Sequence, residues 1–290
     1  MTKAIGFIGL GVMGYPMAGH LSKHNHISIF NRTKAKSENW CNEYNGKICS
    51  SPAELARISD VIILCIGNDK DVRDVITGEE GLAENLSSGS IIVDHTTTSA
   101  KLSLELSEHL KLKDIYYLDA PVSGGEAGAQ LGQLSIMVGG DRESYKLIKN
   151  ILQPYTKLIK YMGPSGFGQY TKMVNQICIA GLIQALAEGI NFSERVGLDT
   201  RNVLEVVSSG AAQSWQMDNR WLTMLDDNYD HGFAVDLMRK DLEIVLDEAD
   251  KNNINIKVTK IVNEYYKDIQ KAGGGRWDTS SLLKRIKKLT

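Results

Sequence analysis

A glycine-rich turn near the start of the chain limits its possible folds more than any other feature. Gly9, Gly11 and Gly14 directly follow a short apolar run, Ala4 to Ile8, and precede a segment with helical spacing, Tyr15 to Lys23. With this spacing the first glycine allows a tight turn, the second lets a pyrophosphate approach the main chain, and the third lets helix and strand pack closely. The helix N-terminus offers unpaired N–H groups to the phosphates. The sequence therefore predicts a dinucleotide-binding turn made of Gly9, Leu10, Gly11, Val12, Met13 and Gly14, against the alternative of a plain glycine-rich turn.

Short apolar runs alternate with helical segments through the first half of the chain. The runs are residues 4–8, 27–30, 61–66, 90–94, 116–119 and 134–138. Strands that are apolar on both faces and alternate with helices indicate a mostly parallel sheet covered on both sides. We therefore expect an α/β fold with a doubly wound, Rossmann-type domain.

After the glycine-rich stretch 163–168 the strand pattern stops, and helical periodicity continues to the C-terminus. We expect a nucleotide-binding domain over residues 1–163 and an all-helical domain for substrate binding and oligomerisation over residues 164–290. Residues 169–196 are apolar around much of a helix and rich in small side chains, a pattern typical of a helix buried between domains or subunits. This segment favours a homo-oligomer, and the sequence does not distinguish a homo-dimer from a homo-tetramer.

Composition excludes several classes of function. The 290 residues carry 33 Lys and Arg and 35 Asp and Glu, a formal net charge of −2, so we expect no nucleic-acid partner. The four cysteines lack metal-ligand spacing, which favours no metal site and a reduced, cytoplasmic setting. The longest uninterrupted apolar run, residues 61–66, is far shorter than the roughly 18 residues of a membrane span, so we expect no membrane association.

The residues after the second apolar run bear on the choice of cofactor. An NAD site usually has an acidic residue there to bind the ribose hydroxyls. This chain instead has Asn31, Arg32 and Thr33, with Lys36 one helical turn later. An arginine can bind a 2′-phosphate that a carboxylate would repel. The sequence therefore favours NADP over NAD, although NAD stays possible and Arg32 could be a plain surface side chain.

Three further segments are more polar than packing requires: residues 119–125, 168–176 and 239–242. Together with the glycine turn, their order and spacing resemble those of the β-hydroxyacid dehydrogenase family, which includes 3-hydroxyisobutyrate dehydrogenase, tartronate semialdehyde reductase and glyoxylate/succinic semialdehyde reductases. The resemblance covers essentially the whole chain. It implies an NAD(P)-dependent oxidoreductase that interconverts a small 3-hydroxy acid and its semialdehyde, with a small carboxylate-bearing substrate.

The resemblance also implies roles for residues at the reacting centre. Lys172 and Asn175 are three residues apart, so they project from one side of a helix. By similarity Lys172 is the general acid and base, and Asn175 binds the substrate oxygen and orients the lysine. Ser123, Gly124 and Gly125 would bind the substrate carboxylate, with Ser123 at the catalytic centre. The alternative for Lys172 is a lysine that reaches solvent from a helix end.

The remaining site residues flank the cofactor or close the pocket. By similarity Thr97, Cys65 and Ile66 contact the cofactor, and Lys240 lies over the nicotinamide. Trp215 and Phe233 are candidates for closing the substrate pocket. Asn219 or Arg220 could bind the far end of a substrate, and His95 has no assigned role. We expect Asp119 to cap or orient its loop, and Asp241 to pair locally.

Three alternatives are related to this architecture. Imine reductases generally lack lysine at the position of Lys172, so its presence argues against that interpretation. A catalytically silent NADPH-binding or sensing protein would be expected to lose Lys172 or the serine-glycine loop first, and both are intact. The roughly 125 residues after Gly163 are also too few for the longer helical domain of 6-phosphogluconate dehydrogenase.

Overall fold

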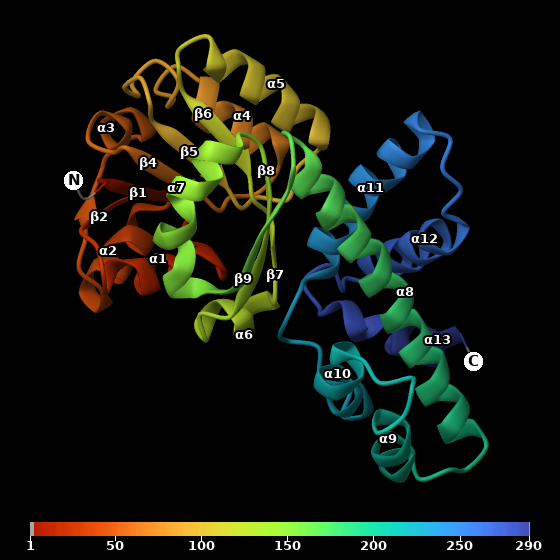
Figure 1. Ribbon diagram of the computed structural model, residues 1–290. Helices are drawn as coiled ribbons and strands as arrows, with labels where there is room; N and C mark the ends of the chain where they lie inside the picture. Colours follow the sequence, from red (N-terminus) through yellow and green to blue (C-terminus); the bar gives the residue numbers. More distant parts are fainter. Residues whose placement is uncertain (1–2, 290) are drawn as a thin grey trace. The chain divides into compact units, whose positions relative to one another are not determined.

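The computed structural model describes residues 3–289 and divides into two compact units, residues 1–172 and 173–290 (Figure 1). The first unit is built on a sheet with strand order β3-β2-β1-β4-β5-β6-β8-β7, in which β9 also pairs with β8. The strands are β1 (Ile5–Ile8), β2 (Ile27–Phe30), β3 (Lys47–Ile48), β4 (Val61–Leu64), β5 (Ile91–Asp94), β6 (Tyr116–Asp119), β7 (Val122–Ser123), β8 (Leu134–Gly139) and β9 (Thr156–Gly163). Strands β1 to β6 pair in parallel, and β8 runs antiparallel to β6 and β7.

Helices cover both faces of this sheet, and β4 shows how. Val61 and Ile63 point into one hydrophobic cluster together with Met17, whereas Ile62 and Leu64 point into another. Alternate side chains of one strand are therefore buried on opposite faces, which confirms the expected doubly wound architecture. The helices of this unit are α1 (Gly14–Ser22), α2 (Lys34–Glu43), α3 (Pro52–Arg57), α4 (Asp69–Thr77), α5 (Ala100–Lys111), α6 (Gly125–Gln130), α7 (Arg142–Leu152) and the 3₁₀ turn η1 (Gln153–Tyr155).

Several of these helices begin at a polar side chain that accepts a hydrogen bond from the first turn. Ser51 does so for α3, Asn68 for α4, Ser99 for α5 and Asp141 for α7. Such caps satisfy N–H groups that have no partner inside the helix. They fix where each helix starts after its strand, and therefore the length of each connecting loop.

The second unit is helical throughout its described residues, as expected. Its core contains Trp221, Met238 and Tyr266, with the inner side of α8 packed against them. The helices are α8 (Phe167–Arg195), which begins in the first unit, α9 (Thr200–Ser208), α10 (Trp215–Leu225), α11 (Val235–Lys251), α12 (Lys257–Lys271), the 3₁₀ turn η2 (Thr279–Ser281) and α13 (Leu282–Leu289).

Two features of helix α8 bear on the sequence expectations. The compact units divide between Lys172 and Met173, a few residues after the expected boundary near residue 164, because the first turns of α8 are bonded into the first unit. Helix α8 is also 29 residues long and apolar, so by length and composition it could cross a membrane. Of its most apolar stretch 44% is buried, and the core helix of a soluble protein has the same composition. The absence of membrane association stays a prediction.

Candidate active site

The three glycines of the predicted dinucleotide turn are required for three different reasons. Gly9 has φ +101°, and a Cβ there would lie 2.2 Å from the carbonyl oxygen of Cys65. A Cβ on Gly14 would lie 1.9 Å from the carbonyl oxygen of Gly9. Gly11 differs, because beyond Gly11 itself and its two chain neighbours no atom of residues 3–289 lies within 4 Å of the position its Cβ would take. Nothing in the described chain fills that space, which fits the close approach of a ligand to the main chain.

The turn lies where a doubly wound sheet binds its ligand. Strand β1 is flanked by β2 on one side and β4 on the other, so the chain order reverses next to it, and Gly9 and Cys65 follow the carboxyl ends of β1 and β4. Crevices at such a reversal are the usual ligand sites of these sheets. A hollow of about 480 Å³ opens here, with Gly11, Val12 and Lys36 among its lining residues.

Asn31 braces this turn against the next loop. Its Oδ1 accepts a hydrogen bond from the Leu10 N–H at 2.9 Å, and its Nδ2 donates to the Thr33 carbonyl at 3.0 Å. We expected Asn31 to contact the cofactor through its side chain. The structure places that side chain between two main-chain segments, which leaves one amide N–H for other partners, so the contact with the cofactor stays a prediction.

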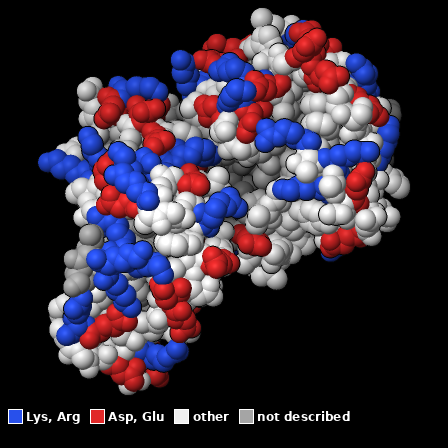
Figure 2. All heavy atoms as spheres, turned by 180° about the vertical axis from the view of Figure 1, so that it is seen from behind, with Lys and Arg blue, Asp and Glu red and all other residues white. Residues whose placement is uncertain are grey.

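Arg32 and Lys36 are the basic groups beside this turn. The Arg32 side chain is 90% exposed and lies 3.6 Å from Asp71, measured from Nη1 to Oδ1. An exposed pair at this distance is weak, so the guanidinium stays available to an anion. Figure 2 shows basic and acidic side chains interspersed over one face of the molecule. A local basic group, rather than a broad positive field, is therefore what the chain offers a phosphate here.

The loop after β5 is held by buried polar groups. Asp94 accepts hydrogen bonds from the Thr96 N–H at 2.9 Å and the Tyr117 hydroxyl at 2.8 Å, and burial raises its pKa to about 6. The Thr96 hydroxyl accepts a hydrogen bond from the Ile66 N–H at 3.1 Å. The two loops expected to flank the cofactor, at residues 65–66 and at Thr97, are thereby tied together.

His95 contributes to the same loop in a way that the sequence did not indicate. Its Nδ1 lies 2.6 Å from the Ala120 carbonyl and its Nε2 lies 2.8 Å from the Tyr155 hydroxyl. The ring is buried, and burial lowers its pKa to about 4. His95 is therefore a neutral brace between the ends of β5 and β6, not a proton carrier at neutral pH.

Asp119 caps the start of helix α8, whereas we expected it to cap or orient its own loop. Its two carboxylate oxygens accept hydrogen bonds from the main-chain N–H groups of Gly166, at 2.8 Å, and Gln169, at 2.9 Å. Burial raises its pKa to about 6, against the opposing effect of these hydrogen bonds. Because α8 carries Lys172, this carboxylate fixes the start of the helix that positions the predicted general acid.

Lys172 and the predicted carboxylate-binding loop meet in the first unit. The Lys172 side chain is buried, and its Nζ donates a hydrogen bond to the Val122 carbonyl at 2.8 Å. Val122 directly precedes Ser123, and Gly124 has φ +134°, a conformation that favours glycine. The structure therefore brings together two of the segments singled out in the sequence, with a buried ammonium beside the Ser123–Gly125 loop.

Other predicted residues form a chain of polar contacts within the second unit. Asn175 donates from Nδ2 to Oε1 of Gln176 at 2.7 Å, and Gln176 donates from Nε2 to Oδ2 of Asp241 at 2.7 Å. The Lys240 ammonium lies 3.1 Å from the other oxygen of Asp241. Asp241 pairs locally, as expected. Gln176, to which we assigned no role from the sequence, links Asn175 to Lys240 through this carboxylate.

The expected pocket-closing residues lie around α10 and the loop before α11. Trp215 is 49% exposed, and the Arg220 guanidinium lies 5.2 Å from its ring centroid. Arg220 also lies 3.1 Å from buried Asp278, which accepts a hydrogen bond from the Phe233 N–H at 2.8 Å. Arg220 is thus held by an aromatic ring and a carboxylate, and Asp278 is a connecting residue that the sequence did not single out.

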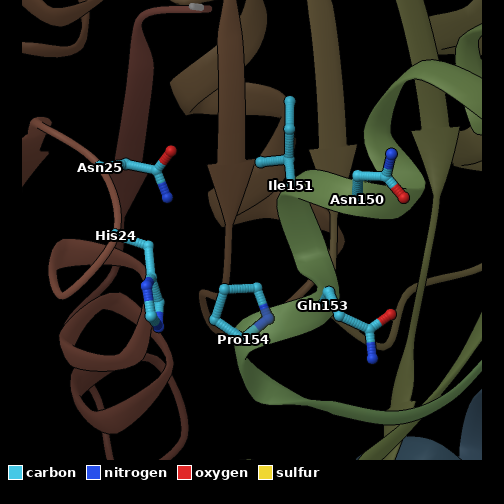
Figure 3. Close-up of a pocket in the computed structure, with 6 residues that line it drawn as sticks. All are labelled: His24, Asn25, Asn150, Ile151, Gln153 and Pro154. Atoms are coloured by element: carbon cyan, nitrogen blue, oxygen red, sulfur yellow. The ribbon is translucent and has the colours of Figure 1, made fainter.

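One hollow of the first unit lies away from the predicted site. It has a volume of about 480 Å³ and is formed by the segment after α1, the end of α7 and η1 (Figure 3). Its lining residues are His24, Asn25, Asn150, Ile151, Gln153 and Pro154. His24 and Asn25 precede β2, so this hollow is at the amino end of a parallel strand, opposite the edge that carries the glycine turn.

A Rossmann-type unit with a glycine turn open to a ligand, followed by a helical unit, is an architecture typical of NAD(P)-dependent oxidoreductases. Sequence comparison agrees with both parts. Residues 4–163 match the NAD-binding domain of 6-phosphogluconate dehydrogenase, and residues 166–286 match the NAD-binding domain of NADP-dependent 3-hydroxyisobutyrate dehydrogenase. The chain belongs to the β-hydroxyacid dehydrogenase family, whose members are oxidoreductases acting on the CH–OH group of hydroxy acids.

Individual relatives match over nearly the full length. An uncharacterised oxidoreductase of Shewanella frigidimarina is 50% identical over 98% of both chains. The 2-(hydroxymethyl)glutarate dehydrogenase of Eubacterium barkeri is 30% identical, over 99% of this chain and 95% of its own. A solved structure of 3-hydroxyisobutyrate dehydrogenase from Mycobacterium tuberculosis with L-serine has a TM-score of 0.90 at 24% identity, over 99% of both chains. A reductive aminase of Aspergillus terreus is more distant, with a TM-score of 0.61 at 19% identity.

Proposed function

We propose that this chain is a dehydrogenase that interconverts a small 3-hydroxy acid and its semialdehyde, prefers NADP, and uses Lys172 as general acid and base. The observation that carries the proposal is the hydrogen bond from Lys172 Nζ to the Val122 carbonyl, because it holds a buried ammonium beside the Ser123–Gly125 loop. Reduction of a semialdehyde acid requires a proton donor for the carbonyl oxygen and a binding site for the carboxylate, and an acid group next to such a loop provides both.

Each residue of the proposed site has its own role in the reaction. The nicotinamide cofactor, when bound, supplies the hydride for reduction or accepts it in oxidation. Main-chain N–H groups of Gly124 and Gly125 and the Ser123 hydroxyl hold the substrate carboxylate. Lys172 donates a proton from Nζ to the carbonyl oxygen during reduction and takes it back during oxidation. Asn175, tied to Gln176, binds the same oxygen.

Cofactor preference rests on the loop after β2. The glycine turn accepts the pyrophosphate, with Gly11 open to it, and Arg32 with Lys36 binds the 2′-phosphate. We expect Thr97, Cys65 and Ile66 to flank the nicotinamide half and Lys240 to cover it. Trp215 and Phe233 close the substrate pocket in this proposal. The hydrogen bond between the loops at residues 66 and 96 supports a common role for them.

The test is NADPH oxidation with glyoxylate, succinic semialdehyde, tartronate semialdehyde and methylmalonate semialdehyde, repeated with NADH. We expect turnover with at least one semialdehyde acid, faster with NADPH, and loss of that turnover in Lys172→Ala while NADPH still binds. Imine reduction under the same conditions would favour the imine reductase alternative. NADPH binding without any turnover would favour the silent sensor.

We also propose a homo-oligomer formed through the outer side of α8. Val174, Cys178, Leu182 and Phe192 recur at helical spacing along this side and are exposed, Phe192 to 65%. A contiguous apolar stripe of this kind is typical of a protein–protein interface. The occupant is a second copy of the chain, in keeping with the expected dimer or tetramer, and no nucleic acid or membrane partner is proposed.

A cytoplasmic location completes the proposal. None of the four cysteines forms a disulfide among the described residues, in keeping with a reducing compartment. Fractionation of cells that express the tagged chain would test this location, and recovery with a membrane or exported fraction would contradict it.

A further inference from the structure

Gln169 is a buried amide whose contacts the proposed chemistry does not yet use. It lies in the first turns of α8 and has no exposed surface. Its Oε1 accepts a hydrogen bond from the Thr98 N–H at 3.1 Å, and its Nε2 donates to the Thr96 carbonyl at 2.8 Å. The Gln169 side chain is therefore hydrogen-bonded to the main chain on both sides of Thr97.

The same residue is joined to the proposed general acid. Gln169 and Lys172 are three residues apart on α8, so their side chains lie on one side of the helix. The Gln169 N–H is fixed by Asp119, and the Lys172 ammonium is fixed by the Val122 carbonyl. All of these groups belong to the first unit. Helix α8 is thus bonded to the Thr96–Thr98 turn at one point and to the Ser123 loop at another.

A side chain that only filled space would not need these two hydrogen bonds. An apolar side chain could fill the volume, whereas Gln169 matches a donor to a carbonyl and an acceptor to an N–H, which sets the position of the turn along the helix. We propose that Gln169 is a positioning residue of the reaction, which sets the separation between Thr97 beside the nicotinamide and the Nζ of Lys172. The inference rests on the proposed roles of those two residues. Small misplacements of reacting groups can reduce rates by about 100-fold.

Substitution by glutamate gives a test that a merely structural role would not pass. In Gln169→Glu the ionised side chain would present only acceptors and would repel the Thr96 carbonyl, whereas the protonated side chain restores one donor and one acceptor. We expect this variant to lose about 10- to 100-fold in kcat above the pKa of the new carboxyl and to approach wild-type kcat on acidification. The KM for NADPH should change much less. Gln169→Met, which lacks both groups, should stay low at every pH.

Controls separate this effect from other titrations and from misfolding. The ionisable groups that face or adjoin Gln169 are present in every variant, so each profile is divided by that of wild type; they are Asp94, His95, Asp119 and Lys172. Gln184→Glu, a buried position further along α8 whose amide bonds to Glu188, should give the wild-type profile. Thermal unfolding checks that each variant is folded.

A second readout uses the protein without cofactor. Hydrogen exchange of the Thr98 amide should be faster in Gln169→Met than in wild type at the same pH. In Gln169→Glu the exchange rate should approach that of wild type, again measured at the same pH, as the pH is lowered. A Gln169→Glu profile parallel to wild type would overturn the inference. If Lys172→Ala retains wild-type turnover, the proposed function itself fails. If Lys172→Ala is inactive but the pH profile of Gln169→Glu runs parallel to that of wild type, only the positioning role of Gln169 is refuted.

Discussion

The ammonium group of Lys172 donates its hydrogen bond to the main-chain carbonyl of Val122, 2.8 Å away. That carbonyl belongs to β7, directly before Ser123, so the orientation of the ammonium and the position of the serine-glycine loop depend on the same peptide. A substrate held by the loop would find the proton donor at a fixed place. The relationship turns two separate sequence motifs into one site.

Replacing this lysine while keeping its charge tests that relationship. In Lys172→Arg the guanidinium is larger and stays protonated, so it cannot exchange a proton near neutral pH. We expect kcat to fall by at least about 100-fold, while the Kd for NADPH changes little. Steady-state kinetics and fluorescence titration with NADPH would show this. Retention of more than a tenth of wild-type kcat would contradict the role of Lys172 as acid and base.

Alanine substitutions at two glycines of the first turn should affect protein stability and cofactor binding separately. A Cβ at position 14 would collide with the Gly9 carbonyl, so Gly14→Ala should lower the free energy of unfolding by roughly 1–3 kcal/mol. Gly11→Ala should unfold like wild type, because no described atom lies near its Cβ, but should bind NADPH at least about tenfold more weakly. Urea unfolding and NADPH titration measure both. The reverse pattern would show that Gly11 does not face the cofactor.

Cofactor preference should depend on Arg32. Its guanidinium is exposed and only weakly paired with Asp71, so Arg32→Ala should reduce kcat/KM for NADPH by about tenfold or more and leave NADH nearly unchanged. Arg57→Ala serves as a control, because this exposed arginine bonds to Asn85 instead. An equal loss with both cofactors would mean that Arg32 does not recognise the 2′-phosphate.

The buried histidine should impose a pH dependence on stability. Burial lowers the pKa of His95 from 6.5 to about 4, so between these values the unfolded chain binds a proton that the folded chain does not. The stability due to neutral His95 is therefore complete above pH 6.5 and declines as the pH falls toward 4. Asp94 and Asp119 act in the opposite sense below pH 6, because burial raises their pKa values from 3.8 to about 6.

Because Asp94 and Asp119 are present in every variant, comparing variants isolates the contribution of His95 to the pH dependence of stability. His95→Gln should be less stable than wild type at pH 7, because contacts with Ala120 and Tyr155 are weakened. The difference should narrow by about 2 kcal/mol between pH 7 and pH 5. Urea unfolding at several pH values measures it, with exposed His24→Gln as the control. A difference that is constant over this range would show that His95 is not buried in its neutral form.

The apolar side of α8 gives a prediction about assembly. Leu182 is 41% exposed in the middle of the stripe, so Leu182→Glu would bury a charge in the proposed interface. We expect wild type to elute as a dimer or tetramer and this variant at lower mass, by size-exclusion chromatography with light scattering. Leu112→Glu, at an exposed leucine outside α8, should assemble like wild type. A wild-type monomer would remove the proposal.

The sequence predicted features that depend on local spacing. The glycine turn, the strands β1, β2, β4, β5 and β6, and the change to helices after residue 163 all follow from short-range patterns. Strand β9 was missed because lysines interrupt its apolar residues and half of it faces solvent. Strands β3 and β7 are only two residues long and give no periodic signal.

Contacts between distant residues lay beyond that analysis. The family motifs point to Lys172, but only the fold shows that Val122, fifty positions earlier, accepts its hydrogen bond. The bridging roles of Asn31, His95 and Gln169 likewise depend on partners in loops distant in the sequence. Polar side chains at loop ends are a general signal for such braces, but their partners are set by tertiary structure.

The brace formed by Asn31 has a consequence for redesign of the protein. Because Asn31 holds the main chain of both Leu10 and Thr33, side chains beyond it can be exchanged without displacing the turn at Gly11. In the proposed function, where Arg32 and Lys36 select the nucleotide and the turn at Gly11 binds the pyrophosphate, nucleotide preference and pyrophosphate binding are therefore separable traits. An NADH-selective form could be sought by changing the surface positions Arg32 and Lys36 alone, whereas any change at Asn31 would alter both traits together.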